Sequence, residues 1–89
     1  LKESLKETIN SKIDEGFEHF VLNLENVKII DSCGVGLIIV ANNVTAARNS
    51  KLYLCHIKPC IIKIFDIMMI SKHLSIFETE EDALEEVKG

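Results

Sequence analysis

In one short stretch of this 89-residue chain, three chemically reactive side chains follow one another directly. In IIDSCGVG, residues 29–36, a carboxylate (Asp31), a hydroxyl (Ser32) and a thiol (Cys33) follow an apolar run and precede two glycines. A carboxylate or hydroxyl in this place can cap a helix, and a hydroxyl can also be phosphorylated. The two glycines allow the backbone to turn sharply or to be approached closely by another group. Their spacing matches neither G-x-G-x-x-G nor GxxxxGK[ST], which disfavours a nucleotide-binding loop.

The three cysteines give no sign of a metal site or of a disulfide framework. Cys33, Cys55 and Cys60 form no CxxC pair, and the three histidines lack the spacing of zinc ligands. No histidine lies near Cys33 in the sequence, which disfavours a catalytic Cys–His pair. We therefore expect no metal and no cofactor, and reduced thiols as in a cytosolic protein. Cys55 lies in an apolar strand pattern and is expected in the core.

A predicted strand and a predicted helix enclose the DSCG motif. From Gly34 to about Asn49, apolar residues recur at helical spacing. The motif is therefore expected at a helix N-terminus near the carboxyl edge of a sheet, where ligands gather and backbone N–H groups favour anions. Either Asp31 or Ser32 can cap this helix.

The strand before the motif is HFVLNLE, residues 19–25, which is apolar almost without a break. Such a run is typical of a strand that is covered on both faces. We therefore expect this strand at the centre of the sheet, with Leu22 and Leu24 both in the core or under helices.

The rest of the chain continues an alternation of helices and strands. The further predicted elements are a helix over residues 1–15 that ends at Gly16, a strand over 51–57, a helix from Pro59 to about Met69, a strand over 74–77, and a last helix from Thr79 to about Val87. The order α, β, α, β, α, β, α predicts an α/β fold with a mainly parallel sheet and helices packed on it. We expect residues 1–89 to form a single domain.

Charge and hydropathy exclude several kinds of partner. The net charge is −4 and no basic stripe is visible, which disfavours nucleic acid. No apolar run reaches the about 18 residues of a membrane span, and no signal peptide is visible, so we expect a cytoplasmic protein without membrane insertion. Six acids fall within nine residues and predict a solvated helix face: Glu78, Glu80, Glu81, Asp82, Glu85 and Glu86.

These motifs, taken in order, resemble the STAS domain of bacterial anti-sigma-factor antagonists. The family pattern has a VLDL or VLNL strand, a (M/I)DSSG(L/V)G loop into a helix, a Pro-started helix with a Phe, an IF strand and an EDAL helix. The matching segments here are HFVLNLENVKIIDSCGVGLIIVANN and KLYLCHIKPCIIKIFDIMMISKHLSIFETEEDAL. The resemblance runs from about residue 1 to residue 88.

The resemblance implies a non-enzymatic protein that regulates transcription by binding a kinase-like anti-sigma factor with serine-kinase activity. It also implies that the contact and regulation point is the motif loop: Asp31, Ser32, Cys33, Gly34, Val35 and Gly36. In the family, the residue before the first glycine is the phosphorylated serine. That position holds Cys33 here, and a thiol is no substrate for an ordinary serine kinase. Ser32 is the possible substitute.

The chain departs from the family a second time at its N-terminus, because family members usually begin with two more strands. We expect these strands to be missing, disordered or supplied otherwise. If they are missing, backbone groups along one strand are left unpaired, and a homodimer is possible. Two other functions stay open: a STAS subunit of a transporter or lipid-trafficking complex, and a thiol-redox protein that acts through Cys33.

Overall fold

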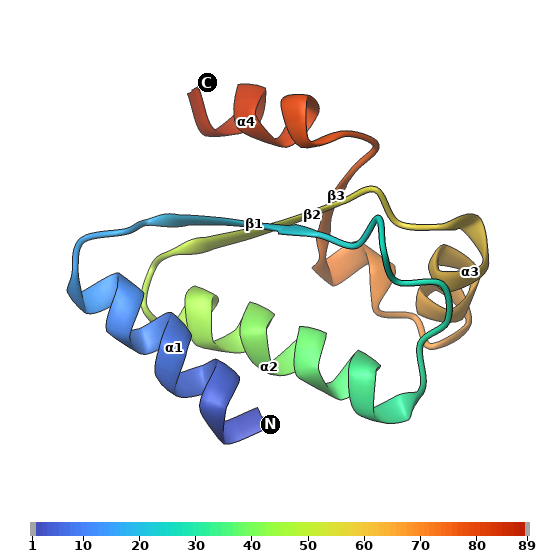
Figure 1. Cartoon of the computed structure of the whole chain (residues 1–89), viewed down its shortest axis with the longest axis horizontal. Coiled ribbons are helices and arrows are strands. Elements are labelled where there is room, and N and C mark those ends of the chain that lie inside the picture. The colour runs from blue at the N-terminus through green and yellow to red at the C-terminus, as the bar shows by residue number, and fades with distance from the viewer. Residues whose placement is uncertain (1, 89) are drawn as a thin grey trace. The chain divides into compact units, whose positions relative to one another are not determined.

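The computed structural model describes residues 2–88, with the side chains of residues 5–88. The elements are α1 (Lys2–Asp14), β1 (His19–Asn23), α2 (Ser32–Ala47), β2 (Lys51–Cys55), α3 (Pro59–Ile67), the 3-10 turn η1 (Ser71–His73), β3 (Ser75–Phe77) and α4 (Glu80–Lys88) (Figure 1). The predicted alternation of helices and strands is confirmed. The short turn η1 was not predicted, and α2 begins two residues earlier than expected.

The three strands form one sheet in the order β1-β2-β3. β2 and β3 are parallel, with Tyr53 opposite Ser75. Along β1 and β2 the hydrogen-bonded partners advance together, because the N–H of Lys51 donates to the carbonyl of Glu18 and the N–H of Leu24 donates to that of Cys55. β1 therefore also runs parallel to β2, and the predicted parallel sheet is confirmed.

The prediction that β1 is the central strand is wrong. Within residues 2–88 the central strand is β2, in which all but the first residue are buried, and β1 lies at an edge. Leu24 is buried at 6% exposure, but Leu22 is only half-buried. An apolar run shows that a strand is covered by other elements, but it does not give the order of the strands.

The chain divides into two compact units, and we describe each by itself. The first contains residues 1–20 and 31–52, and the second contains residues 21–30 and 53–89. Strands β1 and β2 contribute residues to both units. The expectation that residues 1–89 form a single domain stays a prediction.

In the first unit, α1 and α2 lie side by side (Figure 1). The buried residues of this unit include Ile9 from α1 and, from α2, Val35, Ile38, Ala41 and Thr45. The Thr45 hydroxyl donates to the carbonyl groups of Ala41 and Asn42, so its burial leaves no polar group unsatisfied.

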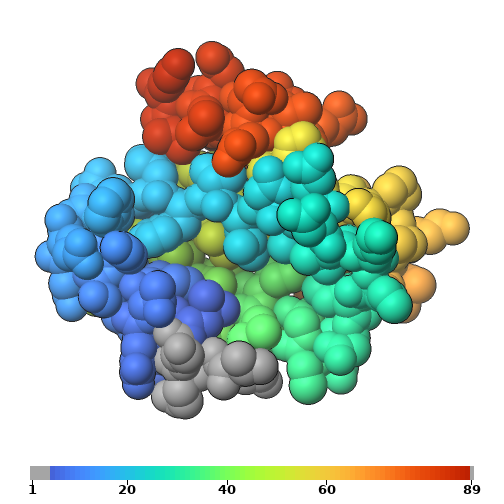
Figure 2. Space-filling view, viewed as in Figure 1, coloured from blue at the N-terminus to red at the C-terminus, as the bar shows by residue number. Residues whose placement is uncertain are grey.

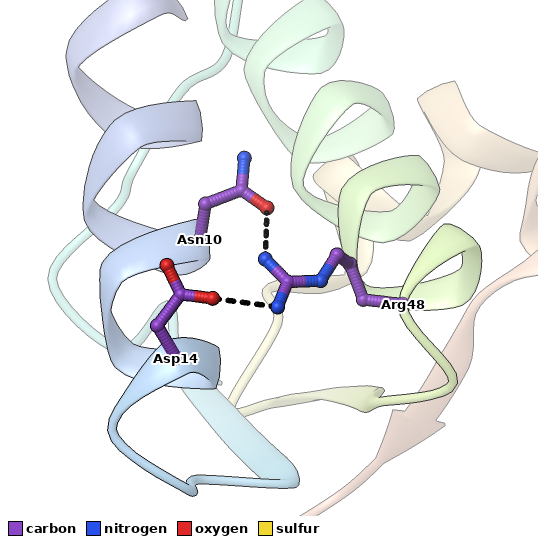
Figure 3. Close-up of polar contacts among 3 residues, drawn as sticks. All are labelled: Asn10, Asp14 and Arg48. Atoms are coloured by element: carbon purple, nitrogen blue, oxygen red, sulfur yellow. Dashed lines mark hydrogen bonds and ion pairs between the residues drawn. The ribbon is translucent and has the colours of Figure 1, made fainter.

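Arg48, the C-cap residue of α2, joins the two helices of this unit (Figure 3). Its Nη1 donates to Oδ1 of Asn10 at 3.1 Å, and its Nη2 donates to Oδ1 of Asp14 at 2.6 Å. The guanidinium group thus fixes the end of α2 against the last two turns of α1.

The second unit has its own set of buried side chains. Leu54, Cys55, Ile61, Phe65 and Ala83 are completely buried, and Leu24 is nearly so. The rings of Tyr53 and Phe77 pack edge to face with 5.6 Å between their centroids. The prediction that Cys55 is a core residue is confirmed.

The ends of the helices in the second unit follow the sequence signals. Pro59 is the first residue of α3, where its missing N–H loses no helical hydrogen bond. The Thr79 hydroxyl accepts a hydrogen bond from the N–H of Asp82 at 3.1 Å, as in a capping box. The six clustered acids around α4 are all exposed, which confirms the predicted solvated face.

Candidate functional site

Asp31 is the residue that caps α2. Its backbone is extended, and its Oδ1 accepts a hydrogen bond from the N–H of Gly34 at 2.9 Å. Its carbonyl group accepts a second bond from the N–H of Val35 at 3.0 Å. The sequence left open whether Asp31 or Ser32 caps the helix, and the structure assigns the role to Asp31. Its negative charge also lies at the positive end of the helix dipole.

The structure places the predicted site residues at the N-cap and in the first turns of α2, with different exposure. Asp31, Ser32 and Cys33 are exposed, whereas Val35 is buried at 2% exposure. We call the three exposed residues the cap triplet. A carboxylate, a hydroxyl and a thiol thus reach solvent next to one another on a fixed helix end. Their role in partner binding stays a prediction.

The glycines of the motif do not have the turning role that the sequence allowed. Among residues 2–88, Gly16 is the only glycine with a positive φ, so Gly34 and Gly36 lie in ordinary helical backbone within α2. Each costs roughly 0.5–1 kcal/mol relative to alanine in a helix interior. Both are half-buried. A close approach of a partner to these residues stays a prediction.

A phosphate on the cap triplet would strongly change the local charge. Asp31 is the acid at this helix end, because the first turn of α2 carries none of its own. A phosphate adds about −1.5 to −2 charges and three acceptor oxygens. On Ser32 it would stand beside the Asp31 carboxylate.

The loop over residues 24–30 belongs to the second unit and leads to the motif. Its backbone turns where the N–H of Val27 donates to the carbonyl of Leu24. Nζ of Lys58 donates to the carbonyl of Glu25 at 2.7 Å, and the thiol of Cys60 lies 3.7 Å from the carbonyl of Lys28. Figure 2 shows this loop, in cyan to teal, at the surface of the face in view.

Sequence reasoning did not assign Lys58 and Cys60 to this loop. Both lie at the start of α3, about thirty residues away in the chain. Pro59 marks that helix start, but the contact between the helix start and the loop depends on tertiary structure that no local pattern encodes.

The remaining thiols and histidines are scattered. Cys33 and Cys60 are exposed, and Cys55 is buried. Within residues 2–88, no three His, Cys, Asp or Glu side chains are grouped in a way that could hold a metal ion. Over the same range, every helix is too short or too polar to cross a membrane.

Comparison with known proteins places these features in a family context. Residues 2–83 match the family model described as the STAS domain. The chain is 28% identical over 71 residues to an anti-sigma F factor antagonist from Paenibacillus polymyxa, an alignment that covers 80% of the chain. It covers 61% of that relative, so the chain spans about three fifths of its length.

Two solved structures share the fold. The crystal structure of a candidate anti-sigma factor antagonist from Thermotoga maritima superposes with a TM-score of 0.85 at 19% identity, covering 99% of this chain and 76% of that one. An NMR structure of the same Thermotoga protein gives a TM-score of 0.85 at 20% identity, with 97% and 70% coverage. At these identities the likeness establishes the arrangement of helices and strands.

Proposed function

The chain belongs to the STAS domain family, and on that premise we propose that it is a non-enzymatic binding protein that acts as an anti-sigma factor antagonist. The observation that carries the proposal is the exposed cap triplet, Asp31, Ser32 and Cys33, at the N-terminus of α2. Its partner would be an anti-sigma factor with serine-kinase activity, and both proteins would act in the cytoplasm.

The geometry of the triplet suits a recognition site. The Asp31 bond to Gly34 and the burial of Val35 fix the first turn, so the exposed side chains are held before a partner arrives. Preorganisation of this kind lowers the entropic cost of association. In the proposal, the anti-sigma factor contacts Asp31 and Ser32 and approaches closely over Gly34 and Gly36.

The same site would carry the regulation. Cys33 stands where the family resemblance places the phosphorylated serine, and its exposed thiol is a poor acceptor for a serine kinase. The proposal therefore has the chain bind its partner without being released by phosphorylation at position 33. Ser32 is also exposed and is the alternative acceptor.

Two other functions receive less support. The relatives reported above carry names that refer to anti-sigma factor antagonism, not to transport, lipid trafficking or thiol chemistry. A redox role for Cys33 would also need a partner thiol, and the sequence provides no CxxC pair.

The test is a binding measurement with the anti-sigma factors encoded by the same genome. Isothermal titration calorimetry should detect a complex with one of them, and Asp31→Asn should weaken it about tenfold, which corresponds to about 1.4 kcal/mol. Asparagine caps helices as well as aspartate does, so the fold should be unchanged. Asp82→Asn removes an exposed carboxylate from α4 and serves as the control. If the wild-type chain binds none of these factors, the proposal is wrong.

A further inference from the structure

Three helices of this protein end in the same way, but one of the three ends has an unsuitable residue. Gly16, Asn49 and Met69 follow α1, α2 and α3, and all three have positive φ, with values of 103°, 58° and 58°. At the end of α3, the N–H of Met69 donates to the carbonyl of Asp66, and the N–H of Ile70 donates to that of Phe65. These are the two bonds of a Schellman motif. Glycine and asparagine adopt this left-handed conformation readily, whereas methionine does so at a cost.

The strained residue lies in an exposed apolar cluster. Ile67 is 80% exposed, Met68 47% and Met69 69%. We call these three residues the α3 patch. The backbone bonds of the Schellman motif hold the patch in place. Neither the conformation of Met69 nor its exposure to water stabilises the fold of the free protein, and methionine adapts well to apolar binding surfaces.

The charges next to the patch are mainly basic. Lys63 precedes Ile67 by four residues on α3, so the two side chains are neighbours on one helix face, and both are exposed. Lys72 is also exposed and lies on η1, which packs against α3. One exposed acid, Asp66, directly precedes Ile67 and accepts a hydrogen bond from the Ser71 hydroxyl at 2.7 Å, so two ammonium groups stand against one carboxylate here. The patch therefore suits an apolar side chain that is surrounded by carboxylates.

Helix α4 of the same unit has this composition. Leu84 is 46% exposed, and its neighbours one turn earlier on the helix are Glu80 and Glu81. On the other side of Leu84, one turn later, the same face carries the exposed Lys88. The N-terminal half of α4 thus offers an apolar side chain beside two carboxylates, which complements the α3 patch.

We propose that the α3 patch of one molecule binds α4 of a second copy of this chain, with Leu84 against Ile67 and Met69 and with Glu80 and Glu81 facing Lys63 and Lys72. The contact is heterologous, because two different surfaces meet. The carboxylates and ammonium groups are exposed, so the association is weakened by salt. This inference is independent of the proposed function of the cap triplet.

Sedimentation velocity over a range of concentrations tests the contact. The weight-average mass of the wild-type chain should rise with concentration, and it should rise less when the ionic strength is increased from about 0.05 M to about 0.5 M. Met69→Gly should weaken self-association at least fivefold while raising the thermal midpoint of unfolding, because glycine removes the side chain and relieves the backbone. Loss of folding cannot then explain the result.

Four further variants test whether α4 is the second surface. Leu84→Ser should weaken association by a similar factor, whereas Ile29→Ser, which truncates an isoleucine that is 82% exposed outside the patch, should not. Glu81→Lys and Lys63→Glu should each weaken self-association, and a mixture of the two should associate more tightly than either alone. A wild-type chain that stays monomeric at about 1 mM, or that associates equally well with Met69→Gly and Leu84→Ser, overturns the proposal. So does association that only Met69→Gly weakens, because α4 is then not the occupant.

Discussion

The carboxylate of Asp31 accepts a hydrogen bond from the backbone N–H of Gly34 at 2.9 Å, three residues further along the chain. One exposed side chain therefore both begins α2 and carries charge to the proposed binding site. A substitution at this position can change folding, recognition or both, depending on whether it keeps the acceptor oxygen, the charge or neither.

Replacement of Asp31 by alanine removes both the acceptor and the charge. Asp31→Ala should lower the free energy of unfolding by about 1 kcal/mol, and Asp31→Asn should change it by much less because the amide oxygen still caps the helix. Urea denaturation measures the difference. Glu86→Ala, which truncates an exposed acid on α4, is the control and should be close to neutral. Equal losses for the alanine and asparagine variants would argue against capping by this residue.

The thiol at position 33 makes the proposed regulation testable. Incubation of the wild-type chain with its kinase partner and ATP should leave residue 33 unmodified, and Cys33→Ser should gain one phosphate there. Sulfur and oxygen differ little in size and the side chain is exposed, so the fold should tolerate the change. After phosphorylation, the variant should bind its partner more weakly because negative charge is added next to Asp31.

Intact-mass spectrometry counts the phosphates on each variant, and peptide mapping identifies the residue that carries them. A phosphate on the wild-type chain that maps to Ser32 would show that the switch uses the neighbouring hydroxyl. Cys33→Ala provides the matched control, since it removes the thiol without adding an acceptor. If Cys33→Ser is not phosphorylated by a partner that binds it, position 33 is not the acceptor position.

The three thiols should differ in reactivity. Cys33 and Cys60 are exposed, whereas Cys55 is buried, and burial together with the negative charges of Glu80, Glu81 and Glu25 raises the pKa of the Cys55 thiol above 9.0. Iodoacetamide should modify Cys33 and Cys60 in the native protein and Cys55 only after unfolding. Mass mapping over time measures this, and rapid native labelling of Cys55 would contradict its placement.

The raised pKa of Cys55 also predicts a pH dependence of stability. The folded state holds the thiol proton more tightly than the unfolded state, so the contribution of Cys55 is complete below the ordinary pKa of 9.0 and declines as the pH rises beyond it. The stability of the wild-type chain should therefore fall more steeply above about pH 9 than that of Cys55→Ala. The comparison of slopes in urea denaturation isolates this residue, because all other titrating groups are common to both chains.

The lysine that holds the loop before the motif can be tested by hydrogen exchange. Lys58→Met keeps the length of the apolar stem but removes the donor to the Glu25 carbonyl. We expect faster amide exchange at Val27, whose N–H closes the turn of this loop, and little change in β2. Lys58→Arg should restore most of the protection. Unchanged exchange at Val27 in Lys58→Met would mean that this bond does not order the loop.

The two leucines of the VLNL sequence should respond differently to a charge. Leu24→Asp places an unpaired carboxylate at a site that is 6% exposed and should prevent cooperative folding, since such burial costs several kcal/mol. Leu22 is half-buried on an edge strand, so Leu22→Asp should lower stability less. Circular dichroism melts of the two variants separate these outcomes. Equal damage from both would mean that Leu22 is as well covered as Leu24.

Local signals in the sequence were enough to predict the four helices and three strands, although they missed the short turn η1 and placed the start of α2 two residues late. Helical periodicity, Gly16, Pro59 and the Thr79–Asp82 pair all mark boundaries through short-range bonding, which a linear pattern contains. The same reasoning placed the DSCG motif at the N-terminus of this helix, although it did not predict which of its side chains are exposed.

The order of the strands and the contacts across the chain could not be predicted in this way. HFVLN and KLYLC are both apolar runs, so hydrophobicity did not distinguish the edge strand β1 from the central strand β2. The bond from Lys58 to the Glu25 carbonyl joins groups 33 residues apart, and it depends on how the chain folds back. The left-handed backbone of Met69 contradicts the preference of its own side chain, so no propensity could have indicated it.

The two ends of α2 are held by different interactions. Asp31 accepts a hydrogen bond from within the first turn of its own helix, whereas Arg48 donates hydrogen bonds to Asn10 and Asp14 of the neighbouring helix α1. The 16 residues between Asp31 and Arg48 form a helix about 24 Å long at 1.5 Å per residue. The contacts of Arg48 with α1 therefore add to the side-by-side packing of the two helices and hold the last turn of α2 in register with α1. Their removal would leave every hydrogen bond inside both helices intact, so truncation of Arg48 should loosen the pairing of the helices at this end without unwinding either one.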